Sequence, residues 1–283
     1  GGKVRKDSLE IRNEKGQLGH GDTKRVGAPR LIEGLSHEVI MSAACGQNYT
    51  LALMEMGSVF AFGENKMGQL GLGNLTDTIP SPAQIIYNGQ PITKMAFGAE
   101  FSMIIDCRGN LCSFGCPEYG QLGHNSDGKF IAWPQQIEYD CKLVPLQVAI
   151  FIEKTKNEDA ACTKRGCARC GQWHQPHSGS GLPEASLLWG SSGYGWLGYT
   201  EQKDEMVPRL VKLFDFPGHG ASQIYAGYTC SFAVSEVGGL FFWGATNTSH
   251  ESTMYPKAVQ DLCSWRIWSL ACGKSSKTRI DPG

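Results

Sequence analysis

Five candidate metal ligands lie close together in the second half of the 283-residue sequence. Thiolates and imidazoles at short spacings are ligands that complete a tetrahedral zinc site. Structural zinc sites usually pair two ligand knuckles across a loop of about twelve or more residues, whereas these five candidates are crowded into sixteen residues. The candidates are Cys162, Cys167, Cys170, His174 and His177.

The stretch that would have to position these ligands is poor in apolar residues. Between Ala160 and Ser186, Leu182 is the only residue of the types Val, Ile, Leu, Met, Phe and Tyr. We therefore expect no buried strand in this interval. Three interpretations stay open: a strand replaced by unrelated sequence, as a shifted reading frame or an alternative splice junction would produce; a real metal site; or a functional inserted loop.

The glycines on both sides of this stretch are periodic. The motif "GQLG" occurs three times at steps of 52 residues and returns once as "GWLG". In three copies, 17 residues separate the glycine of an "ACG"-type motif from the glycine that ends the next apolar run. Such self-similarity indicates a repeat architecture. The glycines of this pattern are Gly16, Gly19, Gly46, Gly63, Gly68, Gly71, Gly98, Gly115, Gly120, Gly123, Gly190, Gly195, Gly198, Gly227, Gly244 and Gly273.

Each repeat unit predicts four short β-strands. "TLAL" and "VFAFG" are apolar runs of strand length, joined by a turn at Gly57. "PAQIIYNGQPITKMAFG" supplies two more strands around Asn88-Gly89, a dipeptide typical of hairpins. Four strands per unit of about 50 residues is the pattern of a β-propeller blade. The sequence therefore predicts an all-β propeller of about five units.

At these motifs the chain resembles a known family. "GQLGHGD", "GENKMGQLGLGN" and the pattern A-C-G…T-L-A-L…V-F-x-F-G resemble the repeats of the regulator of chromosome condensation. These repeats build seven-bladed propellers, so about five units imply an incomplete ring. An incomplete ring leaves edge strands unpaired. We therefore expect the chain to be less stable than a full propeller, or to associate.

The resemblance implies four segments. Residues 1–158 are repeats with a truncated first unit, in which the aromatic-glycine strand is missing and Ile11 takes the place of its glycine. Residues 159–186 are a divergent segment without the repeat, and residues 187–276 are repeats with a truncated last unit. Residues 277–283 form a polar tail.

The resemblance also implies a binding function. Members of this family are interaction platforms, and the founding type promotes nucleotide exchange on a small Ras-like GTPase and holds chromatin. We expect protein partners, among them a small GTPase and mitotic, chromosomal or microtubule-associated proteins, with no cofactor and no covalent catalysis. Two alternatives remain: an active guanine-nucleotide exchange factor, and a degenerate duplicated copy with little function.

Composition limits the partners further. The net charge of −1 gives no electrostatic reason for nucleic-acid binding. No stretch approaches the roughly 18 apolar residues of a membrane span, and the odd number of 11 cysteines is typical of reduced intracellular thiols. We expect a protein of the nucleus and cytoplasm, and the resemblance implies association with mitotic chromosomes or the spindle.

The remaining conspicuous residues are predicted to be structural. "GQLGLG" lacks the Lys-Ser/Thr that a phosphate-binding loop needs. His20 and His124 each follow a "GQLG" motif, and we interpret them as repeat residues. The aromatic residues expected to pack between strands are Phe62, Phe114 and Trp243.

Overall fold

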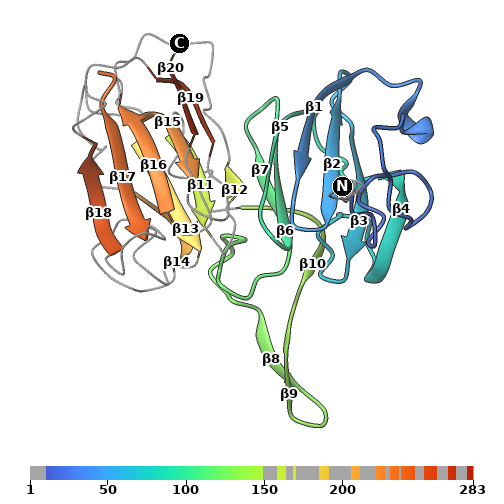
Figure 1. The fold of residues 1–283 in the computed structure, drawn as a ribbon. Helices are drawn as coiled ribbons and strands as arrows, with labels where there is room; N and C mark the ends of the chain where they lie inside the picture. The colour runs from blue at the N-terminus through green and yellow to red at the C-terminus, as the bar shows by residue number, and fades with distance from the viewer. Residues whose placement is uncertain are drawn as a thin grey trace, which may run out of the picture.

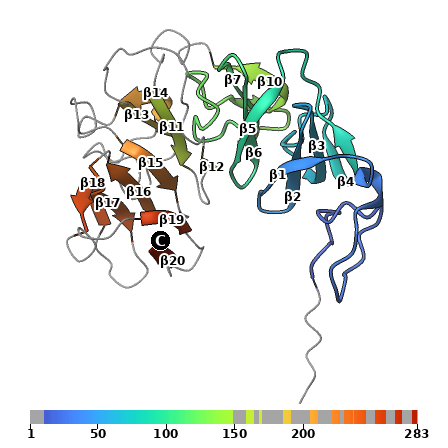
Figure 2. The same ribbon diagram turned by 90° about the horizontal axis from the view of Figure 1, so that it is seen from above.

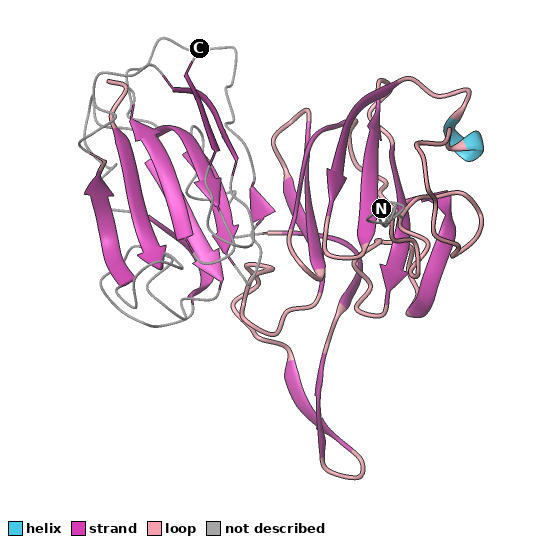
Figure 3. Cartoon of the chain, in the orientation of Figure 1, coloured by secondary structure: helices cyan, strands magenta, loops and turns pink. Residues whose placement is uncertain are grey.

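The computed structural model describes residues 11–148, 158–163, 168–169, 185–190, 205–210, 221–226, 230–235, 237–245, 252–259, 267–271 and 279–282. Regular structure in this part of the chain is β-strand, apart from the short 3-10 turn η1 (Glu33–Leu35) (Figure 3). Four four-stranded sheets, here called blades, follow one another in chain order around an arc (Figures 1 and 2). The all-β propeller architecture is thereby confirmed. Within these ranges no helix is long and apolar enough to cross a membrane.

Three blades are fully antiparallel. The first consists of β1 (Ile40–Cys45), β2 (Tyr49–Met54), β3 (Val59–Asn65) and β4 (Thr76–Gln84). The second consists of β5 (Ile92–Phe97), β6 (Phe101–Asp106), β7 (Leu111–Gly115) and β10 (Lys142–Gln147). The fourth consists of β15 (Ala221–Ala226), β16 (Cys230–Ser235), β17 (Leu240–Ala245) and β18 (Ser252–Ala258). Two further pairs are β8 (Lys129–Ala132) with β9 (Gln136–Tyr139), and β19 (Ile267–Ala271) with β20 (Arg279–Pro282).

The connection at Asn88-Gly89 differs from the sequence prediction. The flanking strands β4 and β5 do not pair, because β4 is an edge of the first blade and β5 is an edge of the second. The chain therefore crosses from one blade to the next at this point, and the expected hairpin is wrong. The Gly57 turn does join two paired strands: the Gly57 N–H donates to the Met54 carbonyl at 3.0 Å.

The third blade has a different strand pattern. It consists of β12 (Ala168–Arg169), β11 (Glu158–Thr163), β13 (Ala185–Gly190) and β14 (Glu205–Leu210), in this spatial order. β11 runs parallel to β13, whereas the corresponding neighbours in the other blades are antiparallel. Strands do occur in 160–186, in the parts occupied by β11, β12 and the start of β13. The expectation that this interval has no buried strand stays a prediction, because the burial of these side chains is not among the described features. The hydrogen bonds of a sheet join backbone N–H and C=O groups, which every residue except proline carries, so small residues can also occupy a strand.

The core lies between blades. All six residues of β6 are buried, as are five of the six residues of β2, because a neighbouring sheet or loop covers each face of these central strands. The main cluster joins the first two blades and includes Leu51, Ile104 and Phe114. Phe62, Phe114 and Trp243 are each at most 1% exposed, which confirms their predicted packing role.

Three loops with the "GQLG" motif share one conformation. In each loop the first glycine N–H donates to the carbonyl three residues earlier: Gly16 to Asn13 at 2.8 Å, Gly68 to Asn65 at 3.1 Å and Gly120 to Pro117 at 2.8 Å. The motif glutamines accept a backbone N–H from two residues earlier, as Gln69 does from Met67 at 2.9 Å. The glycines adopt φ near +70°, which side chains disfavour.

These loops attach each unit to the next blade. The Thr50 hydroxyl donates to the Gln17 carbonyl at 2.9 Å, and 52 residues later the Ser102 hydroxyl donates to the Gln69 carbonyl at 2.8 Å. The second motif glycine lies against an aromatic ring of the following blade: a Cβ at Gly71 would be 2.9 Å from the Phe114 ring. The 52-residue spacing therefore reflects a repeated contact between neighbouring units.

The other predicted repeat glycines fall into three groups. Gly63, Gly115 and Gly244 end or interrupt strands with φ of +115°, +108° and +99°. Gly46 and Gly98 lie under the rings of Tyr49 and Phe101, where a Cβ would collide with the ring. Gly19 and Gly123 repeat the loop geometry, with φ of +71° and +76°, and Gly190 ends β13. Outside the described residues lie Gly195, Gly198, Gly227 and Gly273.

Candidate protein-interaction site

The cysteine-histidine cluster expected from the sequence is mostly outside the described residues. Cys167, Cys170, His174 and His177 all fall in undescribed parts of the chain. The backbone of Cys162 belongs to β11, where it pairs with Trp189 of β13. Metal binding by these five residues therefore stays one of the three open interpretations of this stretch.

The two histidines that follow "GQLG" motifs lie in different surroundings. His124 Nε2 lies 2.9 Å from the Ser113 hydroxyl, and burial lowers the pKa of the imidazole. His20 lines a hollow of about 290 Å³ beside Phe62 and Arg30. Asp22 accepts the Lys24 N–H at 3.0 Å, as a turn residue does.

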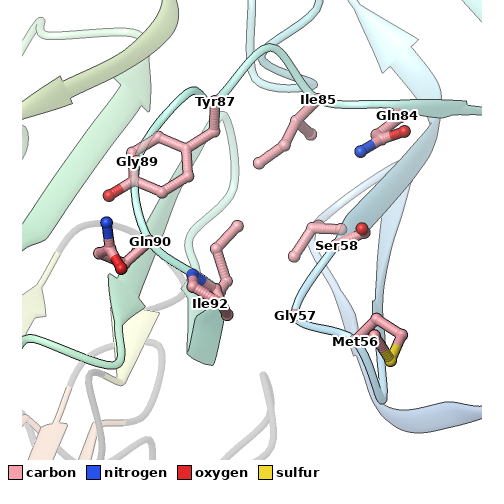
Figure 4. Close-up of a pocket in the computed structure, with 11 residues that line it drawn as sticks. Met56, Gly57, Ser58, Gln84, Ile85, Tyr87, Gly89, Gln90 and Ile92 are labelled. Carbon is pink, nitrogen blue, oxygen red and sulfur yellow. The ribbon is translucent and has the colours of Figure 1, made fainter.

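A small pocket of about 210 Å³ lies between the first two blades. Figure 4 shows Met56, Gly57 and Ser58 on one side, and Tyr87, Gly89 and Gln90 on the other. None of the lining side chains is charged at neutral pH. The pocket thus offers no acid–base pair for catalysis.

A buried carboxylate lies behind this pocket. The Tyr87 hydroxyl donates to Asp106 Oδ2 at 2.9 Å, and Asp106 also accepts the Arg108 N–H together with the N–H and side-chain amide of Asn110. Burial alone would raise the pKa of Asp106, but the hydrogen bonds from Asn110, Tyr87 and Arg108 hold it below its ordinary value. With four hydrogen bonds, this carboxylate is a turn-stabilising group.

The most exposed apolar element in the described part of the chain is the hairpin β8–β9. It projects away from the blades (Figure 1), and its two strands pair only with each other. At the base of the hairpin the Gly128 carbonyl accepts the Asp140 N–H at 2.8 Å, and the chain reverses where the Gln135 N–H donates to the Ala132 carbonyl at 2.7 Å. Its large apolar side chains are exposed as follows: Phe130 45%, Ile131 75%, Trp133 94% and Ile137 56%.

The pairing of the hairpin places apolar groups on both faces. Ile131 is directly opposite Ile137, so these two side chains share one face. Phe130 is opposite Glu138 on the other face, and Trp133 lies at the tip. Large contiguous apolar surface is rare on soluble proteins unless it binds something. We therefore take this hairpin as the candidate interaction site.

Sequence reasoning missed the hairpin, although two signals were present. "KFIA" and "QIEY" are short runs of strand character separated by a proline-containing turn. In the first blade Gly63 pairs with Ile79, sixteen residues later, whereas in the second Gly115 pairs with Lys142, twenty-seven residues later. The eleven additional residues equal the length of 129–139, so the hairpin is an insertion between two repeat strands.

Comparison with known proteins agrees with this architecture. The family model of the regulator of chromosome condensation (RCC1) repeat matches residues 12–53 and 56–105. Human Protein RCC2 is 78% identical over 268 residues, which cover 94% of this chain and 51% of that protein. The chain thus spans about half the length of the curated relatives it matches.

Solved structures show the same fold. Human WBSCR16 superposes with a TM-score of 0.72 at 23% identity, over 96% of this chain and 66% of that one. Prp20p of Saccharomyces cerevisiae, described with its binding properties to Gsp1p and histones, superposes with a TM-score of 0.62 at 16% identity, over 92% of this chain and 58% of that one. The chain therefore carries RCC1 repeats at residues 12–53 and 56–105, has the propeller fold of these solved structures and is similar in sequence to Protein RCC2.

Proposed function

We propose that this chain binds a small Ras-like GTPase and that the hairpin β8–β9 makes the central contact. The observation that carries the proposal is the 94% exposed Trp133 at the tip of a projecting apolar hairpin. Tryptophan side chains are frequent binding hot spots, because they remove a large apolar area from water when they enter a pocket. Support for the partner class comes from the similarity to Protein RCC2 and to Prp20p.

The test is direct binding of the purified chain to a panel of small GTPases in nucleotide-free, GDP and GTP forms. Trp133→Ala should raise the Kd for the GTPase that binds by about thirtyfold, which is equivalent to a loss of about 2 kcal/mol of binding free energy. Met56→Ala is the matched control, because Met56 is 82% exposed on the turn between β2 and β3. If both variants bind with equal affinity, the hairpin does not make the central contact. If no GTPase of the panel binds, the partner is not a small GTPase.

Guanine-nucleotide exchange is the second candidate function, and the projection of the hairpin favours it. An exchange factor acts by inserting a loop against the nucleotide site of its partner, which needs no acid–base residues. Release of a fluorescent GDP analogue from the bound GTPase should then accelerate with the parent chain and not with Trp133→Ala. Tight binding without accelerated release would assign a scaffold role instead.

Mitotic, chromosomal or microtubule partners, and residence in the nucleus and cytoplasm, are part of the same proposal. The similarity to Protein RCC2 supports them. Fluorescence imaging of the tagged chain through mitosis would test both points. Uniform cytoplasmic signal at every stage would contradict them.

A further inference from the structure

Metal-ligating side chains gather at the base of the hairpin, away from the cluster expected from the sequence. One ligand atom from each of Glu100, Cys116 and Glu118 lies within 4.8 Å of the other two. Cys141 precedes Lys142 and Cys116 follows Gly115, and because Lys142 and Gly115 are antiparallel strand partners, the two cysteines lie across from each other at the strand ends. Met67 brings a further sulfur atom, with its Sδ 3.9 Å from the Sγ of Cys141.

Strand pairing fixes this arrangement through the backbone. Gly115 is opposite Phe101 on one side and opposite Lys142 on the other. Cys116 follows Gly115 in the chain, and its N–H donates to the Glu100 carbonyl at 3.0 Å. The ends of three neighbouring strands, β6, β7 and β10, therefore bring Glu100, Cys116 and Cys141 together.

The equivalent place in the first blade holds a positive charge. Fifty-two residues before Cys116 lies Glu64, whose Oε1 is 3.3 Å from the Lys15 ammonium. The residue equivalent to Lys15 in the next unit is Met67. The second blade thus replaces the lysine by a thioether and surrounds the same place with two thiols and two carboxylates.

We propose that Cys116, Cys141, Glu100 and Glu118 bind one Zn²⁺ ion. Zinc takes four ligands in a tetrahedron, with thiolate sulfur at about 2.3 Å and carboxylate oxygen at about 2.0–2.2 Å. Such a tetrahedron has edges of about 3.3–3.8 Å, so the ligand atoms of Glu100, Cys116 and Glu118, which lie within 4.8 Å of one another, need only small side-chain movements. Cys141 would supply the fourth ligand from the neighbouring strand end. Thiolates disfavour Mg²⁺ and Ca²⁺, which prefer oxygen.

The surroundings suit a bound ion. Cys116 is 1% exposed, while Cys141, Glu100 and Glu118 are half-buried, so one side of the site is dry and the other is open to an entering ion. Binding releases the two thiol protons to water and leaves the carboxylates ionised. The ion would join the two ends of the hairpin insertion to the turn before β6, and would thereby fix the direction of β8–β9.

The test uses the purified full chain, stripped of metal by a chelator and returned to metal-free buffer. Zinc is titrated against a chromophoric competitor, and Co²⁺ serves as the spectroscopic probe because thiolate ligation gives a charge-transfer band. We expect the parent chain to bind one ion that Cys141→Ser and Glu118→Gln each weaken at least tenfold, with loss of the cobalt-thiolate band in Cys141→Ser. These residues are half-buried, and circular dichroism confirms that both variants fold.

Two controls make the result specific. Cys107→Ser alters an exposed cysteine outside the site and should leave the affinity unchanged. Cys170→Ala tests the cluster expected from the sequence and should also leave this ion in place. The proposal is overturned if Cys141→Ser and Glu118→Gln bind zinc with the affinity of the parent, or if Cys170→Ala abolishes the only bound ion. It is also overturned if the chain takes up no zinc and oxidised glutathione instead converts the Cys116 and Cys141 thiols to a disulfide.

Discussion

Replacing Tyr49 by phenylalanine removes one oxygen atom from the joint between the first two blades. The Tyr49 side chain is 1% exposed, and its hydroxyl contacts the carbonyls of Gly98 and Phe101 and the hydroxyl of Ser102. All three partners belong to the second blade or to the turn within it. The substitution therefore probes how strongly one blade is attached to the next.

The expected loss follows from what each partner retains. The Phe101 carbonyl still accepts the Gly98 N–H at 2.8 Å, and the Ser102 hydroxyl still donates to the Gln69 carbonyl at 2.8 Å. A net hydrogen bond contributes about 0.5–1.5 kcal/mol, and a buried polar group that loses its partner costs about 1–3 kcal/mol. We expect Tyr49→Phe to lower the free energy of unfolding by about 2 kcal/mol. The ring itself fits, because the equivalent residue in the second blade is Phe101.

Urea unfolding followed by tryptophan fluorescence and by circular dichroism measures the change. Tyr255→Phe is the matched control, since Tyr255 is 56% exposed and should lose less than about 0.5 kcal/mol. A double-mutant cycle with Ser102→Ala should give a coupling energy of at least about 0.5 kcal/mol. If Tyr49→Phe behaves like the control, the hydroxyl does not hold the blades together and the proposed joint is incorrect.

Three further outcomes are expected. Gly63→Ala should lower the free energy of unfolding in urea by at least about 3 kcal/mol, because Gly63 has φ +115° and a Cβ there would be 2.5 Å from a backbone oxygen. The control is Gly27→Ala: a Cβ at Gly27 would have no atom within 4 Å, so this change should alter the free energy of unfolding by no more than about 1 kcal/mol. Asp106→Asn should lower the free energy of unfolding by about 2 kcal/mol at neutral pH. Because the pKa of Asp106 is depressed in the folded state, the carboxylate stabilises the fold fully above the unfolded-state pKa of about 3.9, and this contribution is lost as the pH falls through the folded-state pKa. The difference in stability between Asp106→Asn and the parent should therefore shrink below about pH 4. Replacing 129–139 by two glycines should leave the urea midpoint nearly unchanged, because the ends of this segment already meet through a 2.8 Å hydrogen bond; a collapse of the unfolding transition would show that the hairpin belongs to the core.

The regular blades were predictable because their spacing has a physical cause. The second glycine of the loop motif avoids a collision with an aromatic ring later in the chain, as between Gly71 and Phe114. Changing the distance between the two residues would separate them. Periodic glycines and aromatics therefore predict strands β2, β3, β6 and β7 and the loops between them.

The features outside the repeat were not predictable in the same way. The hairpin β8–β9 has no copy elsewhere in the sequence, and its apolar residues face solvent, so no burial pattern marks it. The zinc ligands proposed above come from strand ends up to 41 residues apart in sequence, since Glu100 and Cys141 meet only when three strands pair. The parallel pairing of β11 with β13 likewise depends on neighbouring strands rather than on its own residues.

The joint between units loses a contact at the third blade, where the strand pattern also changes. The first two loops each receive a hydroxyl from the next unit, from Thr50 and then from Ser102. The hairpin insertion shifts the register by eleven residues, so the position equivalent to Ser102 is Arg165, which has no hydroxyl group, whereas Trp189 precedes Gly190 as Phe114 precedes Gly115. In a repeat protein whose stability is approximately a sum of nearest-neighbour contacts, loss of this hydroxyl removes one contact between the second and third units. The third blade instead takes up β11 parallel to β13, and the antiparallel pattern returns in the fourth blade, where Trp243 is fully buried.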